Sequence, residues 1–251
     1  MKSILIYFFV FFVINTTYSK SVKEDSIWLQ KTCLDIHNKW LKTSIDLTKN
    51  TVGYTAPVAS RTFSYISIGM YESTISILPE LNSLSNQIAN YKRPEIQNKL
   101  TKISALHLSN YVDYELIKYF FENMPPSFKE ITNLKYNENY KLYKKKISKK
   151  EKIKAEEYGD LLLTEIKKVA EKNGGKKAWN NNYPKEYKSP VCEGCWVKTF
   201  PGYISALQPY WGNHTLLIEN NNDTYSNIPY LPFTKDSTTS FFNESKMIYE
   251  L

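Results

Sequence analysis

Three cysteines and three histidines are the side chains of this 251-residue sequence best suited to metal, redox or acid–base chemistry. Cys192 and Cys195 form a Cys-x-x-Cys pair, a spacing found in zinc sites, redox motifs and small disulfide loops. A structural zinc site needs four ligands, and no second pair or nearby His-x-x-x-His supplies the others. A thioredoxin-like motif would follow a strand and open a helix, and neither is predicted here. The sequence therefore favours a local disulfide between Cys192 and Cys195.

The other candidates are scattered along the chain. His37, His107 and Cys33 fall in predicted helices, whereas His214 falls in a predicted loop. A structural role is favoured for each histidine, and Cys33 is expected to be a buried free thiol. The sequence contains no His-Glu-x-x-His, no Gly-x-Ser-x-Gly and no Walker-type phosphate loop. We therefore assign no catalytic residue, no cofactor ligand and no metal ligand from the residues alone.

Helices must position these residues, because helical signals dominate the chain. Small residues on several faces of one predicted helix, at about 58–78, indicate that it is central and largely buried. Ser148 and Glu151 form a plausible capping box for another. No alternating strand pattern is convincing, so we predict an all-α fold, a bundle of about six helices. The helices are expected at about 25–49, 58–78, 94–123, 127–147 and 148–173, with a last one from 236 or 237.

A long irregular segment, residues 175–235, separates the last two predicted helices. It is rich in Asn, Pro, Tyr and Trp and has no sustained hydrophobic period. A loop of this length is far beyond the usual connection, so it should be functional, packed as a cover or partly disordered. Its large aromatic residues favour a packed segment: Trp179, Trp196, Tyr203, Tyr210 and Trp211.

The sequence is basic, with a formal net charge of +8, and eight of its lysines lie between Lys141 and Lys154. This run could bind phosphate or anionic lipid, but a solvated helical face is the favoured interpretation. The run contains no arginine and only Tyr143 as an aromatic residue, so nucleic acid is not expected as a partner.

Residues 1–19 resemble a secretory signal peptide, with Lys2 before the apolar run Ile4–Ile14 and small residues at Thr17 and Ser19. Export to the periplasm or the extracellular space is therefore expected, with residues 20–251 as the mature chain. A retained signal anchor is the alternative. The apolar run is too short to span a bilayer, and no later stretch is apolar enough, so no transmembrane span is predicted.

Several segments, taken in order, resemble bacterial vanadium-dependent haloperoxidase-like proteins of the type 2 phosphatidic acid phosphatase (PAP2) superfamily. The likeness covers most of the mature chain, and Phe200 stands where that family usually has a second proline. The segments are Thr55–Arg61 leading into Tyr65 and Met70–Glu72, Glu157–Asp160 with Gly174–Gly175, Cys195–Tyr203, Gln208–Gly212 and Ser240–Ser245.

The resemblance implies a helical-bundle phosphatase or haloperoxidase, in which a Lys, two Arg, a Ser-Gly-His segment and a second His bind phosphate or vanadate. This chain contains neither Lys-x6-Arg-Pro nor Pro-Ser-Gly-His, so no catalytic residue is carried over. Lys92-Arg93-Pro94 has Asn86 where that motif needs its lysine. The last helix also has a start signal and no stop signal.

The leading hypothesis is therefore a truncated chain, the N-terminal scaffold half of an exported PAP2-type phosphatase or haloperoxidase-like protein, inactive alone. Its partner would be the missing C-terminal half or a complementing subunit. Phosphorylated or halide substrates and vanadate would belong to the intact protein. The alternative hypothesis is a stand-alone exported binding protein that uses the aromatic segment.

Overall fold

A computed structural model describes residues 2–78, 80–96, 99–218 and 231–251, with side chains described from residue 25 onward except that of Asn86. The described residues contain six α-helices and no strand, which confirms the predicted all-α fold. The α-helices are α1 (Lys2–Asn50), α2 (Ala56–Thr74), α3 (Lys102–Phe120), α4 (Pro126–Lys141), α5 (Lys149–Lys172) and α6 (Ser240–Tyr249). Short 3-10 helices span Leu84–Asn86, Lys144–Lys146, Ala178–Asn180 and Trp211–Asn213.

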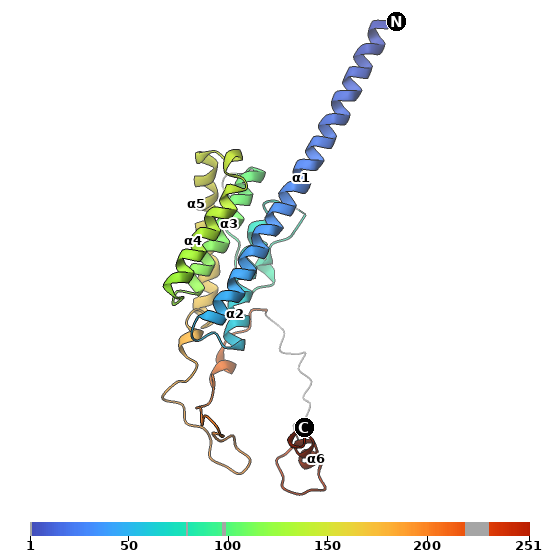
Figure 1. Ribbon diagram of the computed structural model, residues 1–251. Helices are drawn as coiled ribbons and strands as arrows, with labels where there is room; N and C mark the ends of the chain where they lie inside the picture. The colour runs from blue at the N-terminus through green and yellow to red at the C-terminus, as the bar shows by residue number, and fades with distance from the viewer. Residues whose placement is uncertain (1, 79, 97–98, 219–230) are drawn as a thin grey trace. The chain divides into compact units, whose positions relative to one another are not determined.

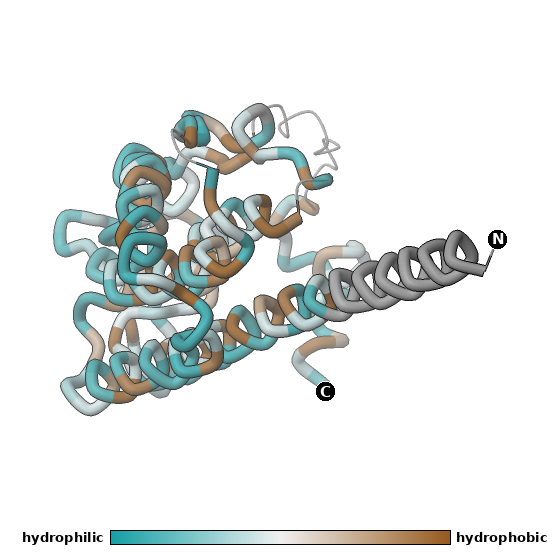
Figure 2. Tube along the Cα trace, turned by 90° about the horizontal axis from the view of Figure 1, so that it is seen from above, coloured by the Kyte–Doolittle hydropathy of each residue, from teal (hydrophilic) through white to brown (hydrophobic). Residues whose placement is uncertain are grey.

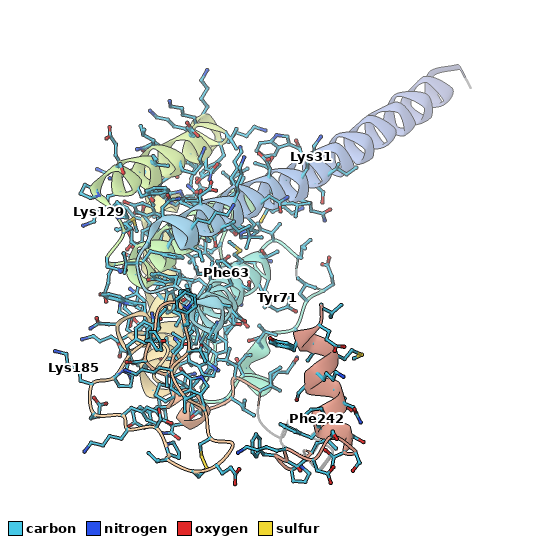
Figure 3. The ribbon with its side chains drawn as sticks, turned by 60° about the horizontal axis from the view of Figure 1, so that its bottom comes forward. Lys31, Phe63, Tyr71, Lys129, Lys185 and Phe242 are labelled. Carbon is cyan, nitrogen blue, oxygen red and sulfur yellow. A yellow bond between two sulfur atoms is a disulfide. The ribbon has the colours of Figure 1, made fainter. Side chains whose placement is uncertain are left out.

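The chain divides into two compact units, here called the helical unit (Met1–Asn180) and the C-terminal unit (Asn181–Leu251). Within the helical unit, α3 contacts α1, α2, α4 and α5 (Figure 1). Figure 2 shows hydrophobic and hydrophilic residues alternating along these helices, as expected where one helical face lies in a core. Lysines such as Lys31 and Lys129 are exposed on the outside of this unit (Figure 3).

The predicted central helix corresponds to α2, but the structure gives the central place to α3. The small residues of α2 do allow close approach, because a Cβ added at Gly69 would collide with Leu116 Cδ1 on α3. Both helices are largely buried, and α3 is buried on more sides. Sequence analysis missed this because α3 buries polar residues, including Ser109, Asn110 and Asp113, which weaken its apolar pattern.

Several predicted helix ends are wrong. The helix expected to reach residue 78 ends at Thr74, and the last helix begins at Ser240 with Thr239 as its N-cap, not Asp236 or Ser237. The helix expected from residue 94 begins at Lys102, and Thr101 is its N-cap, accepting a hydrogen bond from the Ser104 backbone N–H. The preceding segment is held instead by Arg93, whose guanidinium pairs with the buried Glu72 carboxylate at 2.5 Å. The helix expected to reach residue 147 ends at Lys141, because the chain turns there to bury Tyr143 completely.

The predicted capping box at the start of α5 is confirmed. The Ser148 side chain accepts from the Glu151 backbone N–H, and the Glu151 carboxylate accepts from the Ser148 backbone N–H at 2.9 Å. These two bonds satisfy donors that a helix start otherwise leaves unpaired.

Ser148→Ala removes one of these bonds and is expected to lower the free energy of unfolding by about 1 kcal/mol. The measurement is urea unfolding followed by circular dichroism. Thr164→Ala, in the exposed middle of the same helix, is the control and should change stability much less. Equal effects of the two substitutions would contradict a capping role.

The predicted signal peptide falls on residues 1–19, whose side chains lie outside the described part of the chain. It remains a prediction, although the α1 backbone is helical from Lys2. Among the described residues, no helix combines the length and apolar character needed to cross a bilayer.

Candidate functional site

The aromatic part of the C-terminal unit, residues 183–209, is a loop closed at its base. The Gln208 backbone N–H donates to the Asn182 carbonyl at 2.7 Å, and Gln208 Nε2 donates to Asn182 Oδ1 at 2.7 Å. Gln208 is buried and adopts a left-handed backbone conformation, with φ of 49°. These bonds hold the two ends of the aromatic loop together.

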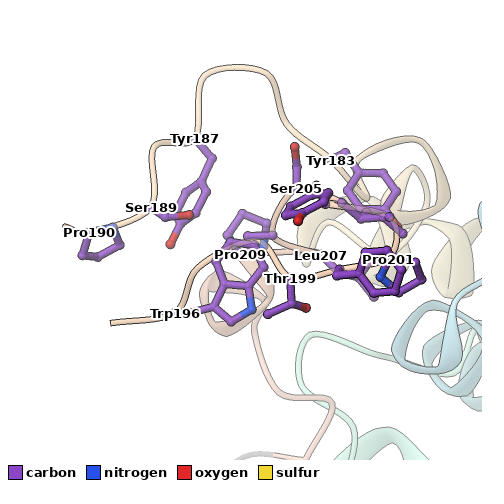
Figure 4. Close-up of a pocket in the computed structure, with 15 residues that line it drawn as sticks. Tyr183, Tyr187, Ser189, Pro190, Trp196, Thr199, Pro201, Ser205, Leu207 and Pro209 are labelled. Atoms are coloured by element: carbon purple, nitrogen blue, oxygen red, sulfur yellow. The ribbon is translucent and has the colours of Figure 1, made fainter. Parts of the chain in front are cut away.

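The aromatic loop lines an open hollow of about 660 Å³, the size of a small-ligand site (Figure 4). Rings and apolar side chains form most of its wall, and no Lys, Arg, Asp, Glu or His lines it. Its lining comprises Tyr183, Tyr187, Ser189, Pro190, Trp196, Thr199, Phe200, Pro201, Gly202, Tyr203, Ile204, Ser205, Ala206, Leu207 and Pro209.

A second hollow, of about 550 Å³, shares part of this wall and includes Cys192 and Cys195. The structure joins these two cysteines in a disulfide. Gly194, between them, has φ of 76° and lies against Phe233, where a side chain would collide with the ring. The disulfide loop and the aromatic wall are therefore parts of one local structure.

The sequence predicted a packed aromatic segment, and for much of the segment this prediction is wrong. Trp196 is 51% exposed, Tyr203 60% and Phe200 80%, whereas Trp179 and Trp211 are half-buried. Large apolar side chains gathered on one exposed segment are typical of a binding surface. This site is suited to contact with an apolar or aromatic group, and it offers no acid–base pair for proton transfer.

A second polar cluster lies inside the helical unit, between α1, α2 and α3. His37 Nδ1 lies 2.6 Å from Asp113 Oδ2, and His37 Nε2 lies 2.9 Å from Thr74 Oγ1 and 3.4 Å from Cys33 Sγ. Cys33 is a free, buried thiol, as predicted. The order thiol, imidazole, carboxylate could activate a nucleophile, but Cys33 is 3% exposed, so a structural role is favoured.

Hydrogen bonding fixes the protons of the His37 cluster. Thr74 Oγ1 donates to the Met70 carbonyl at 2.8 Å, so its hydroxyl proton is not available to His37. His37 Nε2 therefore carries a proton and donates to Thr74 Oγ1. Burial disfavours the charged imidazole, but the Asp113 carboxylate and its hydrogen bond prevail and raise the His37 pKa to about 10. The cluster is a buried imidazolium–carboxylate pair joining α1 to α3.

The raised His37 pKa predicts how stability depends on pH. The protonated form is favoured by folding, so its contribution is complete below the ordinary pKa of 6.5 and is lost as pH rises through about 10. The urea concentration at the midpoint of unfolding should therefore decrease as the pH is raised from neutral to pH 10. Asp113→Asn is the matched variant, and in it this decline should shrink. An equal decline in both proteins would contradict the assignment.

His107 lies in a different environment, on α3. Its Nδ1 is 3.1 Å from the Tyr143 hydroxyl, and its Nε2 is 3.1 Å from Glu156 Oε1. Burial lowers the His107 pKa, against the opposing effect of Glu156, a carboxylate that is partly exposed and also lies near Lys152. His107 is thus a neutral residue in a core network, which agrees with the structural role favoured from the sequence.

The structure brings some of the sequence candidates together and separates others. Cys192 and Cys195 meet in the aromatic loop, and Cys33 meets His37. The His214 ring lies 4.6 Å from the Trp211 ring in the C-terminal unit, tilted by 48°. Sequence analysis missed Asp113, because a single acid in a helical pattern gives no signal that it is buried against a histidine from another helix.

The fold of this chain is similar to that of a solved haloperoxidase. The comparison that shows this is with the crystal structure of a bacterial vanadium-dependent iodoperoxidase. The match has a TM-score of 0.62 and 18% sequence identity, and it covers 84% of this chain and 50% of the iodoperoxidase chain. This chain therefore spans half the length of that protein. No family model matches the sequence, and no curated protein matches it significantly.

The described residues do not fit the vanadate or phosphate group that this fold implies. An oxyanion needs several cationic and hydrogen-bond donors facing one position. Here His37 faces Asp113 and Arg93 is paired with Glu72, whereas His107 is neutral, so none of these three side chains offers an uncompensated positive charge to an oxyanion. Within the described ranges, no group of three or more His, Cys, Asp or Glu side chains could hold a metal ion.

Proposed function

We propose that this chain is the N-terminal scaffold of an exported haloperoxidase-like or PAP2-type phosphatase protein. The oxyanion-binding residues belong to a complementing part, either a C-terminal half or a separate subunit. The observation that carries this proposal is the coverage of the structural match. It extends over 84% of this chain but only 50% of the iodoperoxidase. The sequence adds support, because it has the segments that resemble the family's N-terminal half and lacks Pro-Ser-Gly-His.

The aromatic loop gives the complementing part a surface to contact. Its exposed side chains are large and apolar, and exposing them to water is unfavourable. A complementing helix or loop placed over the 660 Å³ hollow and the adjoining 550 Å³ hollow would remove them from solvent. Those exposed in this way include Val191, Trp196, Val197, Phe200, Tyr203, Ile204 and Leu207.

Export follows from the signal-like residues 1–19 and is consistent with the Cys192–Cys195 disulfide, because disulfides persist in oxidising compartments. The proposed location is the periplasm or the extracellular space. The protein would act there on small phosphorylated compounds or on halides once it is complete.

The test compares the chain alone with the product of any coding sequence that continues its reading frame or lies beside it. Both are assayed for p-nitrophenyl phosphate hydrolysis, and for iodide oxidation with vanadate and hydrogen peroxide. We expect activity only from the completed protein. Activity from the chain alone would contradict the proposal, and His37, His107 and His214 would then be the first residues to substitute. A stop codon after Leu251 with no neighbouring partner gene would also count against it.

A second candidate function is a stand-alone binding module, which is favoured by the fact that the hollow is lined entirely by residues 183–209. An environment-sensitive dye separates the two possibilities. If the loop is a docking surface, addition of the complementing part should displace the dye. If the hollow is a ligand site, the chain alone should bind the dye saturably and lose that binding in Trp196→Ala, and no complementing part should be needed.

A further inference from the structure

A dense positive surface lies where α4 passes into α5 in the helical unit, and the scaffold role does not use it. We call it the basic end. Between residues 141 and 154 it has eight lysines and one acidic residue, Glu151. Most of these side chains are exposed. The lysines are Lys141, Lys144, Lys145, Lys146, Lys149, Lys150, Lys152 and Lys154.

The acids around the basic end are committed to other partners. Glu151 accepts hydrogen bonds from the Ser148 backbone N–H and from the Thr101 hydroxyl, at 2.9 and 2.8 Å. Glu156 is shared between His107 and Lys152. Only Lys152 of the eight lysines has a carboxylate within ion-pair distance among the described residues. The positive charge of the basic end is therefore largely uncompensated.

Apolar side chains are interspersed with these lysines. Leu142 is 44% exposed and Ile153 43% exposed, both within the run itself. The Lys146 ammonium lies 4.1 Å from the centre of the Trp28 ring, which places α1 beside the basic end. Ile27, the neighbour of Trp28, is 56% exposed. Lysines surrounding exposed aliphatic side chains and a half-buried tryptophan match the chemistry of a lipid interface, where ammonium groups meet phosphates and apolar groups enter the boundary.

We propose that the basic end binds an anionic lipid surface and holds the helical unit at the membrane face without crossing the bilayer. Nucleic acid fits the basic end less well, because the run lacks arginine and offers no exposed stacking platform. The exposed aliphatic residues would also gain nothing from a phosphate backbone, whereas a lipid interface can bury them. Charge complementarity and the exposed apolar side chains together favour an anionic lipid surface over nucleic acid as the partner.

The test is co-sedimentation of the full chain with vesicles of phosphatidylcholine alone or mixed with phosphatidylglycerol. The variant carries Lys144→Glu, Lys145→Glu, Lys149→Glu and Lys150→Glu. The matched control reverses four charges near the C-terminal ends of α1 and α5, with Lys42→Glu, Lys49→Glu, Lys168→Glu and Lys172→Glu. Circular dichroism establishes that both variants fold.

We expect the basic-end variant to lose at least about tenfold in binding to the anionic vesicles, while the control loses much less. Binding of the unmodified chain should weaken with added salt and should be much lower on neutral vesicles. Equal losses in the two variants would show only a net-charge effect and would overturn the proposal. So would binding that does not depend on anionic lipid, or a loss of binding to a DNA duplex with vesicle binding unchanged. Leu142→Ser leaves the charge unchanged, so a purely electrostatic attraction predicts unchanged vesicle binding, whereas this proposal predicts weaker binding.

Discussion

Asp113→Ala is expected to lower the free energy of unfolding by about 3–5 kcal/mol. Asp113 is fully buried, and it is the counter-charge of the His37 imidazolium at 2.6 Å. Its removal takes away the carboxylate that keeps His37 protonated, so burial then favours the neutral imidazole, and the charged connection between α1 and α3 is lost. Urea unfolding near pH 7, followed by circular dichroism, measures the change.

Asp35→Ala is the control for this substitution. Asp35 lies on the surface of α1, is 54% exposed and pairs with Lys39 at 2.7 Å, so its loss should cost less than about 1 kcal/mol. Asp113→Asn keeps the shape and removes the negative charge, and its cost should lie between those of the two alanine variants. If Asp113→Ala were as mild as Asp35→Ala, the pair would not be charged, and the His37 assignment would be wrong.

Trp40→Ala is the second large effect, with an expected cost of about 3–5 kcal/mol. Trp40 has no exposed surface, and its Nε1–H donates to Asn110 Oδ1 at 3.0 Å on α3. The substitution creates a cavity beneath α1 and removes one of the two donors to Asn110 Oδ1, since Asn139 supplies the other at 3.1 Å.

The control for Trp40 is Trp28→Ala, because Trp28 lies on the same helix but is only half-buried. Trp28→Ala should change the free energy of unfolding by much less than Trp40→Ala does. Thermal unfolding monitored by near-ultraviolet circular dichroism compares the two variants, because this signal reports tertiary packing. Comparable losses of stability in the two variants would mean that the α1–α3 interface does not supply most of the stability of the core.

Local signals in the sequence predicted the fold class well. The capping box at Ser148 and Glu151 and the termination near Asn173 depend on neighbouring residues, and they are found where expected. The start of α3 was missed because Pro94 is compatible with a helix start, whereas the actual segment is held by the long-range pair of Arg93 and Glu72. Contacts between residues distant in sequence leave no periodic pattern.

The candidate site was predictable in position but not in exposure. The composition of residues 175–235 marked it as unusual, and Cys192 and Cys195 were expected to pair locally. Whether Phe200 or Tyr203 is buried depends on what else packs there, and the sequence of one chain does not contain that information. The same reason explains why His37 could be singled out from the sequence, whereas its partner Asp113 could not.

Vanadate binding tests the scaffold proposal most directly, because vanadate resembles phosphate and both of the proposed activities need an oxyanion pocket. Isothermal titration calorimetry is carried out on the chain alone and on the protein completed by its complementing part, at the same pH and salt. The account predicts no saturable binding by the chain alone and one site per molecule in the completed protein. Stoichiometric vanadate binding by the chain alone would contradict it.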